Sequence, residues 1–479
     1  MSDPRRRLSR PRRDGAVVAV LAFAGLTASF MQTIVIPIQG ELPALLDAPA
    51  EDTAWVITVT LLSAAIATPI SGKLGDMYGK RRIALCMLAL LVAGSVVAAL
   101  SPSVVPLIVG RALQGMGAGV IPLGISILRD VLHRDRLGSA IALVSATLGV
   151  GGALGLPVSA LITERYDWHL LFWIAGALGA TCFALVLWIV PVSTLRSGGR
   201  FDWPGAAGLA VGLVGVLLAI SRGNEWGWSS PGTLTLLLGG VVVLLGWGWM
   251  QLRTPNALVD LRVSARAPVL LTNLASVGMG FALFASNIVY PQLLELPPAA
   301  GGLGLPLLPA SLVLMPAGLA MLAMSPLAGR IERTAGPKPL LVAGSVIIAL
   351  TYLVSVFLEL EVWHVLVINI VIGIGIGLGY AAMPALIMRA VPASETGAAN
   401  GLNALMRSLG TTTAAAAVAA TLSSSAVQVG DALAPSDEGY RAAFLFGLVA
   451  AALCAILAAL IPKPRPVPGE HPAVPEGRI

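Results

Sequence analysis

The chain has 479 residues, of which 57% are hydrophobic and only 11% are charged, and its mean hydropathy is +0.87. These values lie far outside the range of soluble globular domains and exclude that class of protein. The formal net charge of +6 does not indicate nucleic-acid binding, because the basic residues sort to one side of the predicted membrane spans, where they orient the chain and contact anionic lipid.

We therefore predict an all-α integral membrane protein. The hydrocarbon core of a bilayer is about 30 Å thick and needs about 20 apolar residues per helix. The chain contains fourteen such runs, separated by short polar breaks, at residues 15–37, 54–71, 83–100, 104–127, 138–162, 170–190, 203–222, 231–252, 268–293, 304–329, 339–358, 363–388, 397–422 and 440–461.

The charged residues alternate between the two sides of these spans. Most of the 30 Lys and Arg residues fall in every second loop, together with the N-terminus 1–14 and the tail 462–479, and the other loops are acidic. The positive-inside rule then predicts a multi-pass protein of the plasma membrane with both termini in the cytoplasm. The basic start resembles a signal peptide, but the apolar run behind it is long and has no small-residue cleavage site, so we expect a retained first helix.

Metal and cofactor sites are not expected. The 3 Cys and 4 His residues are scattered and lack the spacing of a disulfide framework or a metal site. The sequence also shows no cluster of catalytic side chains, so it predicts neither a cofactor nor an enzyme.

The spans divide into six, two and six. We expect an N-terminal six-helix bundle at 15–190, two inserted helices at 203–252 and a C-terminal six-helix bundle at 268–461. The inserted helices carry almost no polar side chain inside their apolar runs, which favours positions facing lipid.

The two six-helix segments contain matching motifs. The stretches 72–82 and 329–338 share the spacing of their glycines and are both rich in basic residues. The stretches 117–129 and 377–389 each begin with a Gly-x-Gly pair, continue with a proline and end with an arginine. Internal repeats of this kind are typical of transporters.

The stretch Gly72-x-x-x-Asp76-x-x-Gly79-Lys80-Arg81-Arg82 closely resembles the loop signature of the major facilitator superfamily. The fourteen-span layout resembles the drug:proton antiporter branch of that superfamily. Glycines permit a tight turn and a close approach of helices, and an acid here can pair with arginine or cap a helix N-terminus.

The resemblance implies a latch that closes the cytoplasmic side in the outward-open state, with Gly72, Asp76, Gly79 and Arg81 as its residues. The alternative is that the basic residues only fix the topology. In the second copy Arg333 stands where Asp76 would fall, so the latch is expected to be one-sided.

Arg111 lies inside a predicted span, where a charge costs at least about 2.5–3.5 kcal/mol on insertion scales. Its segment, 107–117, is similar to the helix-4 motif of the same superfamily, and that similarity implies a role in proton transfer. Arginine does not itself release protons, but it can lower the pKa of a neighbouring carboxylate or hold water. The alternative is an arginine that snorkels to the surface.

The fifth predicted span carries Gly151, Gly155 and Pro157, which are similar to the antiporter motif of efflux members. The motif departs from the usual Gly-Pro pair, because Leu156 separates Gly155 from Pro157. A bend that controls access and simple close packing of helices both fit this pattern.

Polar residues mark one face of two C-terminal spans. Asn400, Asn403 and Arg407 recur at i, i+3 and i+7, so they share a helix face that should point into the protein. In the ninth span, Asn273 and Asn287 stand at heptad spacing about Gly280, which fits a cavity lining or hydrogen bonds between helices. The substrate-binding candidates are Gln32, Gln114, Asn273, Asn287, Tyr290, Tyr380 and Asn403.

An expected acid is absent. Fourteen-helix antiporters usually carry an Asp in the first helix, but the stretch 30–37 has no carboxylate and no Asp or Glu lies deep in any predicted span. We name Arg111, Glu41 and Arg407 as candidates for proton coupling, with Asp76 and Glu295 as further acids near a span. Without an internal counter-ion, neutral or amphiphilic substrates are favoured over lipophilic cations.

We predict a monomeric exporter of hydrophobic or amphiphilic small molecules, antibiotics among them, driven by the proton gradient and working by alternating access around a midplane site. Its partners would be small-molecule substrates, protons and membrane lipids. One alternative is a carrier of an endogenous lipid or metabolite without proton coupling. An alternative from another class is a membrane-embedded enzyme.

Overall fold

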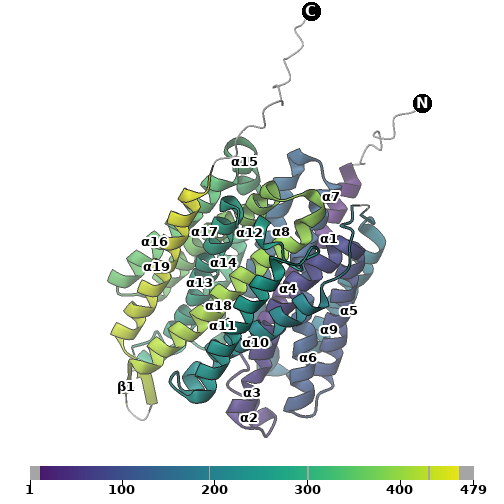
Figure 1. Ribbon diagram of the computed structural model, residues 1–479. Helices are drawn as coiled ribbons and strands as arrows, with labels where there is room; N and C mark the ends of the chain where they lie inside the picture. The colour runs from purple at the N-terminus through teal and green to yellow at the C-terminus, as the bar shows by residue number, and fades with distance from the viewer. Residues whose placement is uncertain (1–10, 194, 299–300, 430–431, 463–479) are drawn as a thin grey trace, which may run out of the picture.

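The computed structural model describes residues 11–193, 195–298, 301–429 and 432–462, and most of them are helical (Figure 1). The predicted N-terminus 1–14 and tail 462–479 lie almost entirely outside the described residues. Residues 11–190, which we call the N-terminal block, form α1 (Pro11–Thr33), α2 (Leu42–Leu45), α3 (Ala50–Thr53), α4 (Trp55–Tyr78), α5 (Lys80–Ala99), α6 (Val104–Met116), α7 (Val120–Val131), α8 (Arg134–Arg165) and α9 (His169–Ile189).

The inserted pair and a second block follow. The pair consists of α10 (Trp203–Trp226) and α11 (Pro231–Gln251), and the short helix α12 (Leu261–Ser264) leads to residues 267–461, the C-terminal block. This block contains α13 (Ala267–Glu295), α14 (Leu307–Ala323), α15 (Ser325–Ala335), α16 (Pro337–Phe357), α17 (Val362–Ala390), α18 (Thr396–Ser424), an antiparallel hairpin of β1 (Ala426–Val429) and β2 (Ala432–Pro435), and α19 (Asp437–Leu460).

Within the described residues, 13 helical stretches are long and apolar enough to cross a membrane. The prediction was fourteen, and the span that falls short is 397–422. It corresponds to α18, which is long enough at 29 residues but carries Asn400, Asn403, Arg407 and many Ser and Thr residues along its length. Two other predicted spans each combine two helices, α6 with α7 and α14 with α15.

Buried apolar side chains separate largely by block. One cluster is built from residues between Ala275 and Ile461 and includes only Ala142 and Ala146 from the N-terminal block. Two further clusters lie between Val17 and Val190, with two residues of α17 added. Each block therefore has apolar clusters of its own, and a fourth cluster joins α4, α10 and α18 across the two blocks.

The inserted pair is not uniformly exposed. Only 11% of the apolar stretch of α11 is buried, which fits the predicted position facing lipid. In contrast, α10 packs on α4 and α18 as well as on α11. At the end of α10, Arg222 is 1% exposed, pairs with Glu225, donates to the Glu51 carbonyl at 3.1 Å and lies over the ring of Trp55. The predicted position facing lipid therefore fits α11, whereas α10 also packs between α4 and α18.

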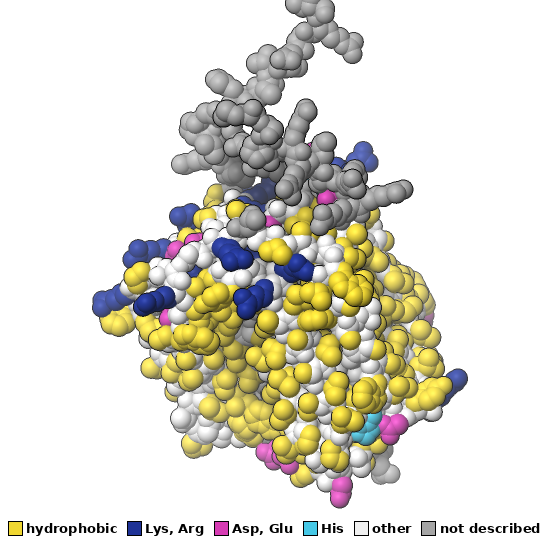
Figure 2. Space-filling view, turned by 90° about the vertical axis from the view of Figure 1, so that its right-hand side faces the viewer, with side chains coloured by type: hydrophobic (Ala, Val, Ile, Leu, Met, Phe, Trp, Pro, Cys, Tyr) yellow, Lys and Arg dark blue, Asp and Glu magenta, His cyan; other side chains and the backbone are white. Residues whose placement is uncertain are grey.

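Charge is distributed unevenly along the helix bundle. The start of α1 and the end of α19 lie at the same end as α15, whereas α2, α3 and β1 lie at the opposite end (Figure 1). In Figure 2, Lys and Arg side chains gather towards the first of these ends, Asp and Glu side chains lie at both ends, and hydrophobic side chains cover the region between them. We call the first the basic end and the other the opposite end.

Candidate functional site

Asp76 joins the two blocks at the basic end. Its helix, α4, ends two residues later because Gly79 adopts a φ of 107°, which favours glycine. The Asp76 side chain is 1% exposed and accepts hydrogen bonds from the backbone N–H of Gly397 at 3.0 Å and of Ala398 at 2.8 Å. These amides belong to the first turn of α18, where N–H groups lack partners within the helix and carry a partial positive charge. Asp76 therefore caps a helix of the other block.

Glycines allow α4 and α18 to come this close. A side chain at Gly72 would collide with the backbone of Gly397, and a side chain at Gly401 would collide with the carbonyl oxygen of Thr68. Gly72 thus has a steric role in the contact that Asp76 completes.

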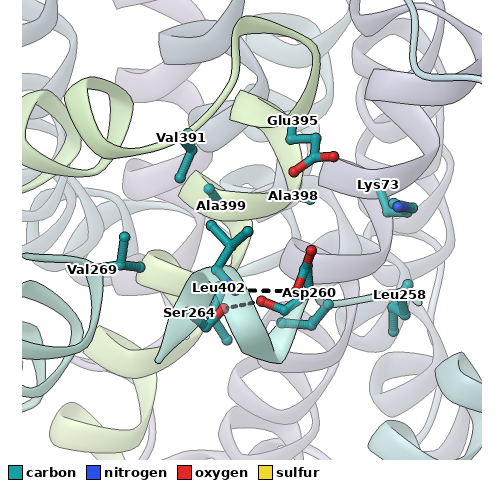
Figure 3. A pocket seen from close by; sticks show the side chains of 12 residues that line it. Lys73, Leu258, Asp260, Ser264, Val269, Val391, Glu395, Ala398, Ala399 and Leu402 are labelled. Atoms are coloured by element: carbon teal, nitrogen blue, oxygen red, sulfur yellow. Dashed lines mark hydrogen bonds between the residues drawn. The ribbon is translucent and has the colours of Figure 1, made fainter. Parts of the chain in front are cut away.

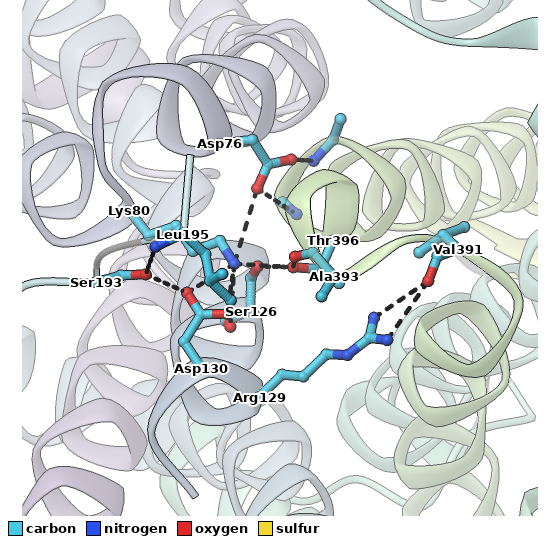
Figure 4. A network of polar contacts seen from close by, with 12 residues as sticks. Asp76, Lys80, Ser126, Arg129, Asp130, Ser193, Leu195, Val391, Ala393 and Thr396 are labelled. Carbon is cyan, nitrogen blue, oxygen red and sulfur yellow. Dashed lines mark hydrogen bonds and ion pairs between the residues drawn. The ribbon is translucent and has the colours of Figure 1, made fainter. Parts of the chain in front are cut away.

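Lys80 is the centre of a buried network beside Asp76 (Figure 4). Its side chain is 1% exposed, and Nζ lies 2.9 Å from both carboxylate oxygens of Asp130 and 2.9 Å from the hydroxyl of Thr396. The Thr396 hydroxyl lies 2.5 Å from that of Ser126. We call Asp76, Lys80, Ser126, Asp130 and Thr396 the interblock cluster. Separating the blocks would break hydrogen bonds to buried charges, which is costly unless water replaces them.

Two neighbouring contacts support this cluster. The Ser193 hydroxyl donates to Asp130 at 2.6 Å, and the Arg129 guanidinium donates to the Val391 carbonyl of the C-terminal block at 3.4 Å (Figure 4).

The structure places Lys80, and not Arg81, in the interblock cluster. Arg81 is half-buried and donates to the carbonyl oxygen of Leu187 in its own block. Because α5 begins at Lys80, directly after the turn at Gly79, successive side chains diverge by about 100° and only the first points between the blocks. The predicted latch set is corrected accordingly.

The second copy of the motif also brings an acid to the other block. A side chain at Gly329 would collide with Ser139 at the start of α8, and one at Gly138 would collide with the carboxylate of Glu332. Glu332 pairs with Arg389 of its own block at 3.1 Å. The sequence repeat placed Arg333 at the position of Asp76 and predicted that this stretch has no acid there. In the structure the preceding residue, Glu332, lies against the other block instead.

Arg111 is enclosed within the N-terminal block. It is 0% exposed and donates to the Met31 carbonyl of α1 and to the Gln114 side chain, both at 2.8 Å, and to the Val56 carbonyl of α4 at 3.3 Å. Gln114 donates in turn to Ser95 of α5 at 2.9 Å. These contacts connect four helices through one guanidinium and its amide partner.

Arg407 belongs to a second polar group, in the C-terminal block. Its guanidinium donates to Asn403 at 3.2 Å and lies 5.1 Å from the ring centre of Tyr380. Asn403 is 1% exposed and donates to Asn273 at 3.0 Å and to Ser276 at 2.8 Å on α13. The predicted inward face of α18 thus lies against α13 and α17.

The remaining candidates lie apart from these two groups. Gln32 is half-buried near the end of α1, and Asn287 and Glu41 are exposed. Tyr290 is 0% exposed, lies 2.9 Å from the Ser355 hydroxyl and packs on Phe444 inside the C-terminal block. The structure brings together Asn273, Tyr380, Asn403 and Arg407, and it places Gln114 with Arg111.

The glycines of the antiporter-like motif pack α8 on α1. A side chain at Gly151 would collide with the Leu26 carbonyl and with Ser29, and one at Gly155 would collide with Thr33. Pro157 lies inside α8, which continues to Arg165. Of the two interpretations of this motif, close helix packing is the one that the geometry displays.

A small hollow lies at the basic end between α12, α18 and α4 (Figure 3). Val269, Val391 and Leu402 line it together with Lys73 and Glu395. It is separate from the polar group around Arg407.

Several residues of the interblock cluster were missed from the sequence. Asp130 directly follows the arginine that ends the repeated motif, and this position was the available signal for it. Ser126 and Thr396 gave no signal, because hydroxyl residues are common in membrane helices. No group of three His, Cys, Asp or Glu residues in the described ranges could hold a metal ion.

Within the described residues, eleven membrane-length helices in the two blocks and two in the inserted pair define a multi-pass membrane protein, and a polar cluster joins the two blocks at the basic end. The model of the Major Facilitator Superfamily matches residues 21–415 and 362–478, and the chain belongs to this superfamily. It is therefore a transporter and not an enzyme.

Curated relatives and solved structures agree with this assignment. The chain is 26% identical over 360 residues to the lincomycin resistance protein LmrB of Listeria monocytogenes, covering 74% of this chain and 75% of the relative. It is 28% identical over 361 residues to the putative multidrug resistance protein MdtD of Cronobacter sakazakii, covering 74% of each. The solved structure of the proton:xylose symporter XylE has the same fold, with a TM-score of 0.66, 14% identity and coverage of 95% of this chain and 97% of that one.

Proposed function

We propose that this transporter exports hydrophobic or amphiphilic small molecules, antibiotics among them, by proton-coupled alternating access. The drug-resistance names of its relatives support the substrate class, at identities of 26% and 28%. The exposed apolar surface between the two charged ends is suited to a protein that takes substrates from the membrane (Figure 2).

The interblock cluster is the observation that carries the mechanism. Alternating access needs contacts that hold one side shut and can be released. Asp76 and Lys80 are each 1% exposed and are hydrogen-bonded across the interface to the first turn of α18. Opening that side would expose both charges to water. The cluster is therefore stable in the closed state, and water can replace its hydrogen bonds in the open state.

The arrangement in the membrane is part of the proposal. We take α18 as a fourteenth span, 15–190 and 268–461 as two six-helix bundles, and 203–252 as an inserted pair. The basic end faces the cytoplasm of a bacterial cell, so both termini are cytoplasmic and the closed side is the cytoplasmic one. The protein works as a monomer in contact with lipid.

Proton coupling requires a group that changes charge. Of the acids named from the sequence, Glu41 and Glu295 are exposed and Asp76 is buried. We place the coupling proton on Asp76, because protonation would weaken the two N–H bonds that it accepts from α18. In this proposal neither arginine carries the coupling proton: Arg111 holds helices of the N-terminal block together, and Arg407 contacts the substrate.

Everted membrane vesicles test the proposal. With respiration acidifying the lumen, addition of lincomycin or another exported compound should raise the luminal pH and accumulate the compound inside, and empty-vector vesicles should show neither. Accumulation without any pH change would favour the second candidate, a carrier of an endogenous lipid or metabolite without proton coupling. Absence of accumulation for every compound tested would contradict drug export.

A further inference from the structure

Arg407 differs from the other intramembrane arginine in the number of donors that it leaves free. Arg111 is 0% exposed and bonds to two backbone carbonyls and an amide through Nε and Nη1, so that only its Nη2 lacks a partner in the described residues. Arg407 is only half-buried, and within the described residues its guanidinium donates a single hydrogen bond, to Asn403. Most of its N–H groups are therefore available to another molecule.

Asn400 extends this group along the same face of α18. It lies two turns before Arg407, and the side chains of a helix lean towards its N-terminus, so the guanidinium is directed towards Asn403 and Asn400. Asn400 is 3% exposed, yet both its amide nitrogen and its amide oxygen lack a partner in the described part of the chain. A buried amide without partners is costly, so Asn400 is able to bond a polar atom of another molecule.

The charge of this group is uncompensated. The contacts of Arg407 are an amide oxygen and the face of the Tyr380 ring, and the structure shows no ion pair between Arg407 and a described residue. A cation in the interior of a membrane protein is costly when it stands alone. A guanidinium is also the side chain best shaped to bind a planar anion through two parallel hydrogen bonds.

We propose that the transported molecule carries an anionic group, such as a carboxylate, sulfonate or phosphate, on a hydrophobic body, and that Arg407 binds this group. Asn400 hydrogen-bonds a polar atom of the same molecule, one to two turns nearer the interblock cluster. This inference rests on the proposed export of amphiphilic molecules and names their chemical class.

Three probes with one aromatic body provide the test: 2-naphthoate, neutral 2-naphthamide and cationic 2-naphthylmethylammonium. Equilibrium dialysis against the full-length protein in lipid nanodiscs measures the affinity of each. We expect naphthoate to bind at least about tenfold more tightly than naphthamide, the factor that corresponds to about 1.4 kcal/mol, and the ammonium probe to bind most weakly.

Variants separate a binding role from a folding role. Arg407→Gln should reduce the preference for naphthoate to about twofold or less. Arg407→Lys should retain only part of it, because the charge remains but the two parallel hydrogen bonds are lost. Asn400→Ala should leave the preference for naphthoate unchanged, because each probe carries a single polar group, and Asn400 lies seven residues, about 10 Å along the helix, from Arg407. Arg165→Gln, which removes an exposed arginine at the end of α8, is the matched control and should leave the preference unchanged. Size-exclusion profiles show that each variant is folded.

Equal affinities for naphthoate and naphthamide in the unmodified protein would overturn the inference. Binding of none of the probes, or a preference that survives in folded Arg407→Gln, would do the same. The vesicle assay is scored separately, with an antibiotic that carries a carboxylate used beside lincomycin, which has a basic amine and no anionic group. Absence of export for both with an intact anion preference contradicts only the proposed function, and export without an anion preference contradicts only this inference.

Discussion

The stretches 72–82 and 329–338 occupy matching places in the two blocks but hold the opposite block in different ways. Asp76 is 1% exposed and accepts two backbone N–H bonds from the first turn of α18. Glu332 is 11% exposed and lies against Gly138 near the start of α8, and its bonded partner is Arg389 of its own block.

This difference shows that repeated sequence does not imply repeated energetics. Both stretches use glycine to bring a helix end against the other block. In the first, two charged residues, Asp76 and Lys80, then bond across the interface, whereas in the second the charged pair is satisfied within one block. The first stretch should therefore control the closed state, and the following variants test that asymmetry from the largest expected effect to the smallest.

Lys80→Met should have the largest effect, because it leaves the carboxylate of Asp130 buried without its cation. Breaking a buried ion pair in this way costs about 3–5 kcal/mol, measurable as a loss in the free energy of unfolding in detergent. Arg81→Met is the matched control and should cost less than about 1 kcal/mol. Adding Asp130→Asn to Lys80→Met should recover part of the loss. Equal costs for Lys80→Met and Arg81→Met would contradict the cluster.

Asp76→Asn should reduce transport at least about tenfold at normal membrane levels. Hydrogen bonds to charged groups contribute about 1.5–3 kcal/mol each, and two of them hold the first turn of α18. The same change should increase maleimide labelling of a cysteine placed at position 400 in a Cys86→Ser background, because the closed interface opens more often. Wild-type transport together with wild-type labelling would return this stretch to a purely topological role.

Glu332→Gln should reduce transport by only about twofold. The Arg389 side chain of its ion pair is 47% exposed, and pairs of this kind contribute about 0–1 kcal/mol. The measurement is the same efflux assay, with Asp76→Asn run in parallel. A loss as large as that of Asp76→Asn would show that both stretches hold the closed state equally.

Arg333→Ala should have the smallest effect, with stability within about 0.5 kcal/mol of the parent and unchanged efflux. Arg333 is exposed, although the sequence repeat aligns it with Asp76. A strong defect in this variant would show that Arg333, and not Glu332, is the residue equivalent to Asp76 at the interface between the blocks.

Long apolar runs predicted the helices well, because a bilayer requires a fixed length of apolar chain. The run 397–422 also predicted α18, which is less apolar than the other long helices because its Asn, Ser and Thr side chains are satisfied by neighbouring helices rather than by lipid. The predicted inward face of α18 was confirmed in part by the bonds that Asn403 makes to Asn273 and Ser276.

Single-residue register could not be predicted. Lys80 and Arg81 are adjacent in the sequence, and Glu332 and Arg333 are adjacent too, but one step along a helix turns a side chain by about 100°. Which of two neighbours points between the blocks depends on where the helix begins, and Gly79 sets that point for α5. Likewise Tyr290 and Tyr380 looked equivalent in sequence, but only Tyr380 lies beside Arg407.

The last turn of α10 ties the inserted pair to both blocks. Arg222 donates to the Glu51 carbonyl of the N-terminal block, and Asn224 donates to the Ala416 carbonyl of the C-terminal block at 3.2 Å. Both bonds lie at the end of the protein away from the interblock cluster. Moving the two blocks apart at that end would break one of these two hydrogen bonds, so the inserted pair opposes such a movement.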